Sequence, residues 1–366
     1  MLVLGTQTFI PSAEARFSGL AVGFMTKPVE LVFNDAVEGR LLLPRVCSLS
    51  VSCYEAPEVR EAVAVVMEEV LYALAMNGMD LRALDGITFS RDCRAAAMAL
   101  QGLPEGQNPL ELGHQPDTME MARTVAVWRG KELRFHIVFR AGIGLMTMAQ
   151  ETGLQAAAEA CIAHEAAHVE HEGHLYRTFP GMYGCPLECG NRSRRIFMKA
   201  MDVWSEYAAC RSSARFRPEA VDEFEGTFCR AVEEAFETSC AQVAKYRLDR
   251  SHNDALTGIP ELFGDVFVHA GYFLGHLDGL ELSFADIFPR LKMLFQKHPK
   301  LGELIVRLRQ TLEELWLSES SWTSIGVFTP IYDLILEMLM MQGLALTKHE
   351  GEWRPALFES LNGSEH

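Results

Sequence analysis

The sequence predicts an α+β protein whose strands lie mainly in the first half of the chain and whose second half is almost entirely helical. Short runs of alternating apolar residues occur at 29–33 and 47–53. An alanine-rich run follows in the middle of the chain, and from about residue 218 apolar residues recur at the spacing of amphipathic helices. We therefore expect a small sheet with covering helices, followed by a helical region.

The first segment, residues 1–84, is expected to supply two strands and one helix that pack on a central core. The strands are the two alternating runs, in which side chains at every second position would share a face. The helix is expected from about 57 to 77, because Pro57 suits a first helical turn and Gly78 follows the last one. Its apolar stripe should face the core.

The second segment, residues 85–215, is expected to form the central core. It begins with a short strand at 87–89 and a helix at 91–101, for which Ser90 is the N-cap candidate. Two further runs of strand-forming residues, separated by Arg129-Gly130-Lys131, have the spacing of a hairpin. The strands of this hairpin are expected at 124–128 and 133–139.

The third segment, residues 216–366, is expected to be a helical C-terminal region. Ser283 and Asp286 have the spacing of a small capping box, and residues 344–353 have the pattern of a closing hairpin. The expected helices span about 218–248, 260–277, 284–297, 300–317 and 326–342.

The charge, the apolar segments and the cysteines of the chain indicate where the protein is located and which kinds of partner it does not bind. A net charge of −16 argues against a nucleic-acid partner and against an anionic membrane surface. Residues 1–23 lack the pattern of a signal peptide, and the apolar stretch 325–346 carries Asp333 and Glu337 near its middle. Nine cysteines, an odd number without framework spacing, indicate reduced thiols. We expect a cytoplasmic protein with no membrane partner.

His164, Glu165 and His168 form the sharpest chemical signal, a His-Glu-x-x-His sequence within the alanine-rich run 154–171. Residues four apart share one face of a helix, so the two histidines can bind the same small cation. Glu165 lies about 100° round the helix from His164, near enough to reach a metal-bound water. The pattern predicts Zn²⁺ bound by His164 and His168, with Glu165 as the general base.

The order of elements from about Asp85 to Arg211 resembles the core of zincin metallopeptidases, in which a strand, a helix and a hairpin precede the His-Glu-x-x-His helix. The resemblance implies a zincin-like core with a small mixed sheet and an active-site helix. It also implies that the strand near Phe135–Phe139 is the sheet edge on which an extended peptide substrate pairs. The chain is loosely similar to cytosolic peptidases of the ImmA/IrrE type, which cut regulatory proteins.

Two histidines leave a zinc ion short of ligands, so a third protein ligand is required. In gluzincin-type zincins a glutamate on a later helix supplies it, commonly within Glu-x-x-Ala-Asp. A helix is expected here at about 194–211, and it contains Glu206 followed by Ala209 and Cys210. Glu206 resembles the ligand glutamate, although Cys210 stands where the pattern has an aspartate that would orient a ligand histidine.

His174 is the competing third ligand. It lies ten residues after His164, which is the separation in the metzincin pattern His-Glu-x-x-His-x-x-Gly-x-x-His. That pattern needs a glycine at its seventh position to turn the chain, and His171 occupies this position here. Gly173 comes too late for the turn. We therefore favour Glu206, and interpret His171 and His174 as residues that line the site or polarise the substrate.

The resulting functional prediction is a gluzincin-type zinc peptidase that cuts a protein substrate, with zinc on His164, His168 and Glu206 and with Glu165 as base. The alternative is a non-catalytic interaction or regulatory protein that retains the zincin fold. An intact Glu165 argues against the alternative, because a structural zinc needs no base, whereas Cys210 in place of the aspartate argues for it.

Three further features of the sequence concern a cysteine pair, the donor to the oxyanion and a cluster of basic residues. Cys185 and Cys189 are expected to lie in a constrained loop as free thiols, because a second cysteine pair that would complete a zinc site is missing. The oxyanion donor is left open among four residues, Tyr207, His171, His174 and Arg211. A basic cluster, expected to form a solvated helix face, comprises Arg192, Arg194, Arg195, Lys199, Arg211, Arg215 and Arg217.

Overall fold

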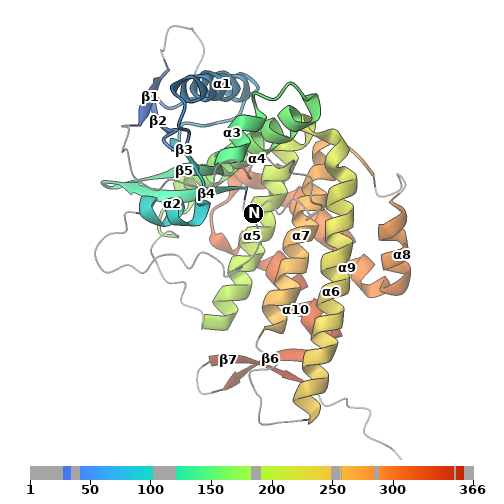
Figure 1. The fold of residues 1–366 in the computed structure, drawn as a ribbon. Coiled ribbons are helices and arrows are strands. Elements are labelled where there is room, and N and C mark those ends of the chain that lie inside the picture. The colour runs from blue at the N-terminus through green and yellow to red at the C-terminus, as the bar shows by residue number, and fades with distance from the viewer. Residues whose placement is uncertain are drawn as a thin grey trace, which may run out of the picture. The chain divides into compact units, whose positions relative to one another are not determined.

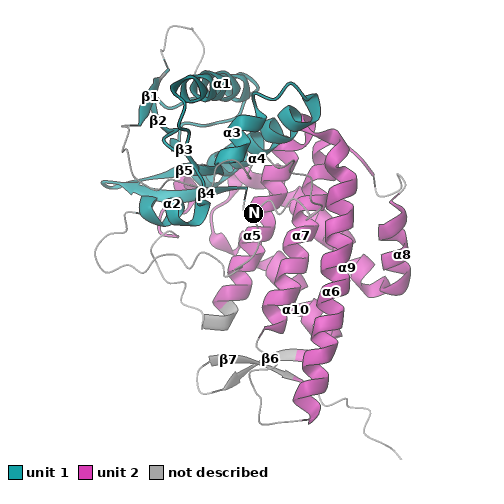
Figure 2. Ribbon diagram, in the orientation of Figure 1, with its two compact units in different colours: residues 1–174 teal, residues 175–366 magenta. Residues whose placement is uncertain are grey.

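The computed structural model divides the chain into two units, residues 1–174 and 175–366 (Figure 2). The division falls within one helix, α4 (Thr152–Thr178). It differs from the three segments expected from the sequence, with boundaries after residues 84 and 215, and that three-part reading stays a prediction. The structure describes residues 28–33, 42–101, 121–182, 191–248, 256, 258–283, 288–349 and 352–357.

Unit 1 is built on a five-stranded mixed sheet with the strand order β1-β2-β3-β5-β4 (Figure 1). The two inner pairs, β2 with β3 and β3 with β5, are parallel, whereas β1 with β2 and β4 with β5 are antiparallel. An α+β fold with a small mixed sheet is therefore confirmed. The strands are β1 (Val29–Val32), β2 (Val46–Ser50), β3 (Leu84–Ser90), β4 (Ala122–Arg129) and β5 (Glu132–Arg140).

Helices α2 and α4 lie on opposite faces of this sheet. Cys93 and Ala97 of α2 (Cys93–Leu100) pack against Val125 of β4. The neighbouring residue on β4, Thr124, contacts α4 through a hydrogen bond to Glu165. Because successive side chains of a strand point to opposite faces, α2 and α4 cover different sides.

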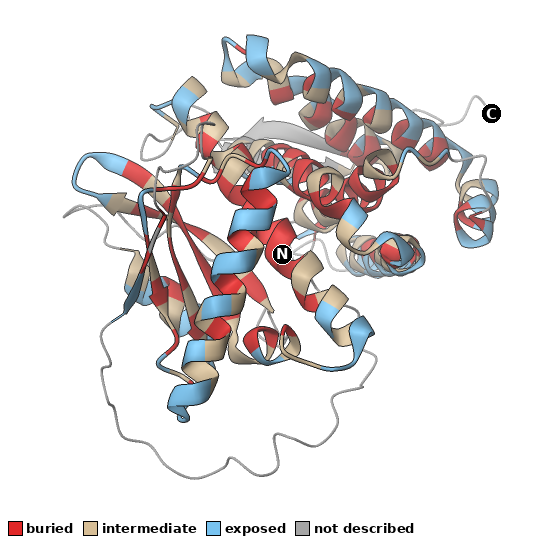
Figure 3. Ribbon diagram, turned by 90° about the horizontal axis from the view of Figure 1, so that it is seen from above, coloured by how far each residue is buried: buried red, intermediate tan, exposed pale blue. Residues whose placement is uncertain are grey.

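Helix α1 (Pro57–Met76) confirms the helix expected at this place, with proline at its first turn. Its buried residues recur at the spacing of one helix face and are Val63, Met67, Leu71, Leu74 and Ala75. A shorter helix, α3 (Ala141–Met146), follows β5 directly. Figure 3 shows buried residues along the strands and on one face of the helices, with exposed residues on their outer faces.

Strand β4 is one of the two edges of the sheet, with β1 at the other. The sequence prediction that placed the substrate-facing edge at Phe135–Phe139 is wrong. These residues belong to β5, which pairs with β3 on one side and with β4 on the other. Both sides of β5 are therefore used within the sheet. Among the described strands, β4 pairs only with β5 and leaves its other side available for a further strand.

Unit 2 is almost entirely helical, as expected. Its two strands, β6 (Leu344–His349) and β7 (Glu352–Leu357), form the antiparallel hairpin predicted near the end of the chain. The helices are α5 (Asn191–Ser213), α6 (Val221–Leu248), α7 (Ile259–Gly279), α8 (Pro289–Lys297), α9 (Pro299–Ser318) and α10 (Thr329–Met341). Short 3₁₀ helices occupy Ala214–Phe216, Pro218–Ala220, Glu319–Ser321 and Ile325–Phe328.

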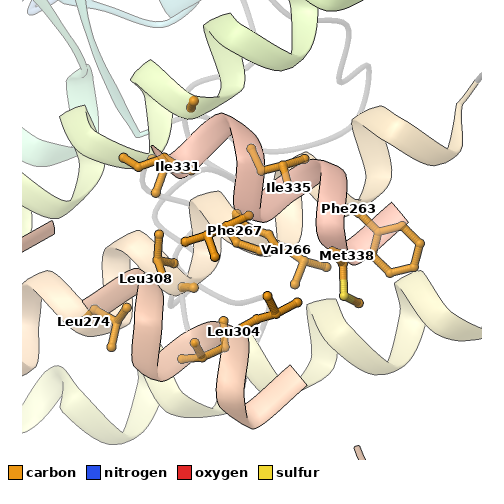
Figure 4. Close-up of a cluster of buried hydrophobic side chains, with 14 of the residues drawn as sticks. Phe263, Val266, Phe267, Leu274, Leu304, Leu308, Ile331, Ile335 and Met338 are labelled. Carbon is orange, nitrogen blue, oxygen red and sulfur yellow. The ribbon is translucent and has the colours of Figure 1, made fainter. Parts of the chain in front are cut away.

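Helix α7 is the centre of unit 2 and packs directly on the backbone of α5. A Cβ atom at Gly271 would lie 2.6 Å from the carbonyl oxygen of Val203, and one at Gly275 would collide with the carbonyl of Tyr207. Glycine at these two positions therefore lets the helices approach closely, which fixes α5 firmly. The apolar core around α7 includes Phe263, Val266, Phe267, Leu304, Leu308, Ile331, Ile335 and Met338 (Figure 4).

Two capping predictions are wrong, and one helix is longer than expected. Asp92 is the N-cap of α2, where its carboxylate accepts a hydrogen bond of 2.9 Å from the backbone of Ala95, whereas Ser90 lies outside the helix. Helix α8 begins at Pro289 with Phe288 as its N-cap, so Ser283 does not cap it, and Asp286, the other residue of the expected capping box, lies outside the described residues. Helix α4 extends beyond the alanine-rich run 154–171 and continues through Gly173, because a buried glycine is tolerated inside a packed helix.

Candidate metal centre

His164 and His168 lie one turn apart on α4 and face each other. Their Nε2 atoms are 3.1 Å apart, and both side chains are buried. Two nitrogens that bind one tetrahedral zinc at about 2.05 Å would be about 3.3 Å apart. The pair therefore has nearly the separation that a shared zinc ion requires, as the four-residue spacing predicts.

Glu206 on α5 joins these two histidines in a group that could hold a metal ion. Each of the three residues offers one ligand atom, and these atoms lie within 4.8 Å of one another. Glu206 is 8 % exposed, which is unusual for a glutamate. Two imidazoles and one carboxylate form a donor set found in catalytic zinc sites, so the residues fit this metal.

His174 is not part of such a group among the residues that the structure describes. It lies on the same helix as His164 and His168, ten and six residues further on, and its side chain is half-buried. The continuous helix explains this, because the metzincin arrangement needs a turn after the second histidine and α4 makes none. The choice of Glu206 over His174 stays a prediction about the metal-bound protein.

Glu165, the predicted base, is 2 % exposed and is held by a residue of the sheet. The Thr124 hydroxyl lies 2.9 Å from its carboxylate oxygen Oε2 and 3.1 Å from its backbone carbonyl oxygen. Thr124 was not identified from the sequence, which contains no local signal that relates positions 124 and 165. Only the pairing of β4 in the sheet brings them together.

Two buried cysteines lie close in sequence to the predicted ligands. Burial raises the pKa of the Cys161 and Cys210 thiols well above the ordinary range, and the carboxylates of Glu165 and Glu206, respectively, add to the effect. Both thiols are therefore protonated at neutral pH. Cys210 accordingly carries no negative charge, unlike the aspartate that the gluzincin pattern has at this place.

Two of the four candidates for the oxyanion donor, Tyr207 and Arg211, take part in a hydrogen-bond network with Asp278. The Tyr207 hydroxyl donates to Asp278 at 2.7 Å and accepts a hydrogen bond from Arg211. Burial, followed by the charge of Asp278, raises the pKa of Tyr207. Arg309 binds the other oxygen of Asp278, so the four residues form one network that connects α5, α7 and α9. His171 and His174 stay candidates for the oxyanion donor.

The basic cluster is largely neutralised by carboxylates of its own unit. Arg195 pairs with Glu261 at 2.6 Å, and Lys199 pairs with Asp265 at 2.7 Å. Arg217 contacts Glu223. These ion pairs support the interpretation as a solvated helix face. The side chain of Arg192 and the two residues Cys185 and Cys189 lie outside the described part of the chain.

A second polar cluster, also missed from the sequence, joins β3 and β5. The His136 Nδ1–H donates to Asp85 at 2.8 Å, and its Nε2 lies 2.9 Å from the Thr88 hydroxyl. Arg129 binds both oxygens of Asp85. Burial alone would raise the pKa of Asp85, but the hydrogen bonds and charges of His136 and Arg129 lower it to about 2. The one signal in the sequence was a histidine inside an apolar strand.

Comparisons with protein-family models, curated proteins and solved structures found no match. Within the described residues, none of the helices combines the length and the apolar character needed to cross a membrane.

Proposed function

We propose that this chain is a zinc-dependent peptidase of gluzincin type, with a zincin-like core, that hydrolyses a peptide bond in a protein substrate. The observation that carries the proposal is the buried group of His164, His168 and Glu206, with Glu165 next to the first histidine. A structural zinc site would need four protein ligands and no adjacent carboxylate held by its own hydrogen bond.

In the proposed reaction three of these residues would bind the metal and the fourth would transfer protons. A zinc ion on His164, His168 and Glu206 would lower the pKa of its bound water from about 15.7 toward 7 and polarise the scissile carbonyl. Glu165 would take a proton from that water and pass it to the leaving amine. The low exposure of all four side chains would strengthen these interactions by excluding other water.

The substrate would be an extended peptide segment that pairs with β4. This strand has an unused side among the described strands, and its residue Thr124 touches the proposed base. Main-chain hydrogen bonds along β4 would therefore place a peptide next to Glu165 without demanding a particular sequence. The net charge of −16 disfavours nucleic acid as partner, and the thiols of Cys47, Cys53 and Cys161 suit a cytoplasmic location.

A non-catalytic protein with the same fold is the second candidate, and one observation favours it. Cys210 is a protonated thiol where the gluzincin pattern has an aspartate, so no carboxylate from this position orients a ligand histidine. In that case the metal would brace the helices and Glu165 would have no proton to transfer.

Metal analysis and one substitution distinguish these candidates. The full-length protein, purified without chelators, should contain about one zinc per chain, and it should cleave members of a fluorogenic peptide library. Glu165→Gln should retain zinc and the melting temperature but lose cleavage. Glu159→Gln, the same change on the same helix at a residue bonded to Gln155, is the matched control.

Two results would overturn the proposal. The absence of zinc after metal-sparing purification and reconstitution would remove the metal centre. Equal cleavage by wild type and Glu165→Gln would remove the assigned base, and a zinc-loaded protein that cleaves no library member and no cellular protein would favour the non-catalytic candidate.

A further inference from the structure

One hydroxyl group connects the edge strand of the sheet to the proposed general base. Thr124 Oγ1 lies 2.9 Å from Oε2 of Glu165 and 3.1 Å from the backbone oxygen of the same residue. A threonine hydroxyl has a single proton to donate. Since a hydrogen bond to an ionised carboxylate is stronger than one to a neutral carbonyl, the proton is directed to Oε2 when Glu165 is charged.

The sheet fixes the position of this hydroxyl. Thr124 pairs with Ile137 in the antiparallel ladder between β4 and β5, and Ile137 is fully buried. The flanking residue Val125 packs on α2 on the opposite face, which sets the direction of the Thr124 side chain. As a β-branched residue, threonine also has few rotamers in a strand. The donor is therefore held by the backbone of β4.

The contact constrains a side chain that would otherwise be adjustable. A glutamate has three rotatable bonds, and a base must aim one oxygen at the water from which it takes the proton. Fixing Oε2 on Thr124 leaves Oε1 as the oxygen that would face the water. The base would then need no reorientation before proton transfer.

We propose that Thr124 is a positioning residue for Glu165, so that the strand expected to receive the substrate also aims the general base. This inference rests on the proposed peptidase function. Thr124 takes no part in the proposed reaction itself and would act through the Glu165 carboxylate. Hydrogen bonds that support the ligands of a metal site typically contribute about 10- to 100-fold to affinity or activity, and we expect a loss near the lower end of this range here.

The test uses the full-length, zinc-loaded protein and acetohydroxamate as a probe. This compound binds zinc through its two oxygens and gives its hydroxyl proton to a neighbouring carboxylate, so its affinity reports how Glu165 is aimed, without a known substrate. Thr124→Val removes the hydroxyl and keeps the shape, whereas Thr124→Ser keeps the hydroxyl. Thr88→Val is the matched control, because Thr88 bonds to His136 in the same sheet and not to Glu165.

Thr124→Val should bind acetohydroxamate about 10-fold more weakly at unchanged zinc content, and it should lower kcat on a cleaved library peptide while KM stays the same. Thr124→Ser and Thr88→Val should behave as wild type. In a Glu165→Gln background, Thr124→Val should have no further effect on the probe, because its partner carboxylate is gone. If Thr124→Val does not fold, Thr124→Ala takes its place in the same comparison.

The outcomes separate this inference from the proposed function. If Glu165→Gln weakens the probe and Thr124→Val does not, Thr124 has no positioning role and the peptidase proposal stands. An equal loss in both backgrounds would show that Thr124 acts through the fold and would overturn the inference. If wild type binds neither zinc nor the probe, the peptidase proposal fails and the inference fails with it.

Discussion

His164 and His168 place their Nε2 atoms 3.1 Å apart across one turn of α4. Both rings are buried, and a pair of neutral imidazoles at this distance needs a proton or a cation between the two nitrogens. A bound zinc would satisfy both lone pairs at once. Under the proposed function the metal would therefore contribute to the stability of the protein as well as to its chemistry.

Glu206→Ala should lower zinc affinity strongly and reduce the melting temperature of the zinc-loaded protein, because it removes one of the three proposed ligands. His174→Ala, at a half-buried residue of the same helix as the histidine pair, should change neither quantity appreciably. Competition with a chromophoric chelator and thermal denaturation measure the two effects. A larger loss of zinc in His174→Ala than in Glu206→Ala would identify His174 as the third ligand.

Stability should fall in acid because of Asp85. Its pKa is about 2 in the folded protein against an ordinary value of 3.8, so folding favours the charged form. The difference corresponds to about 2 kcal/mol of stability, which is fully present above pH 4 and is lost as the pH falls toward 2.

Urea denaturation at several pH values tests this prediction. Asp85→Asn should be less stable than wild type at neutral pH and should show a weaker loss of stability between pH 4 and 2. Glu61→Gln, at an exposed residue of α1, should follow the wild-type curve. A wild-type slope retained in Asp85→Asn would assign the acid sensitivity to other carboxylates.

Gly275→Ala should destabilise the protein by about 3 kcal/mol or more, because its new methyl group meets the backbone carbonyl of Tyr207, which cannot move independently of α5. Gly264→Ala is the control on the same helix, since its nearest neighbour is Cγ of the flexible Lys199 side chain at 2.9 Å. Chemical denaturation compares the two variants. Similar losses in both would mean that the close approach of α7 to α5 is not required for stability.

Glu225 should stabilise the packing of α8. Its buried carboxylate accepts a hydrogen bond of 2.9 Å from the backbone N–H of Leu291 in the first turn of that helix. Glu225→Ala should cost about 1–3 kcal/mol because this buried N–H loses its acceptor. Glu225→Gln keeps a carbonyl oxygen at the same place and should cost less, and equal losses in denaturation experiments would contradict the capping role.

The parts of the site that follow from local geometry could be predicted from the sequence. The pairing of His164 with His168 requires only that α4 is helical, because residues four apart share a face of any α-helix. The hairpin of β4 and β5 followed from two strand-forming runs around Arg129-Gly130-Lys131. The signals for α1 were equally local, with Pro57 at its first turn.

The parts that depend on long-range pairing could not be predicted. Strand β3 pairs with β5 and not with β4, which is the next strand along the chain, and this order makes β4 an edge strand. The contact between Thr124 and Glu165 depends on that order. Likewise, Ser283 has a local capping pattern, but the following helix begins only at Pro289.

The most direct test of the proposed metal centre is a crystal structure of the zinc-loaded protein with anomalous scattering measured on both sides of the zinc absorption edge. We expect one strong anomalous peak per chain, about 2.0–2.2 Å from Nε2 of His164, Nε2 of His168 and a carboxylate oxygen of Glu206. A peak bound by His174 in place of Glu206, or the absence of any peak between the two histidines, would contradict this expectation.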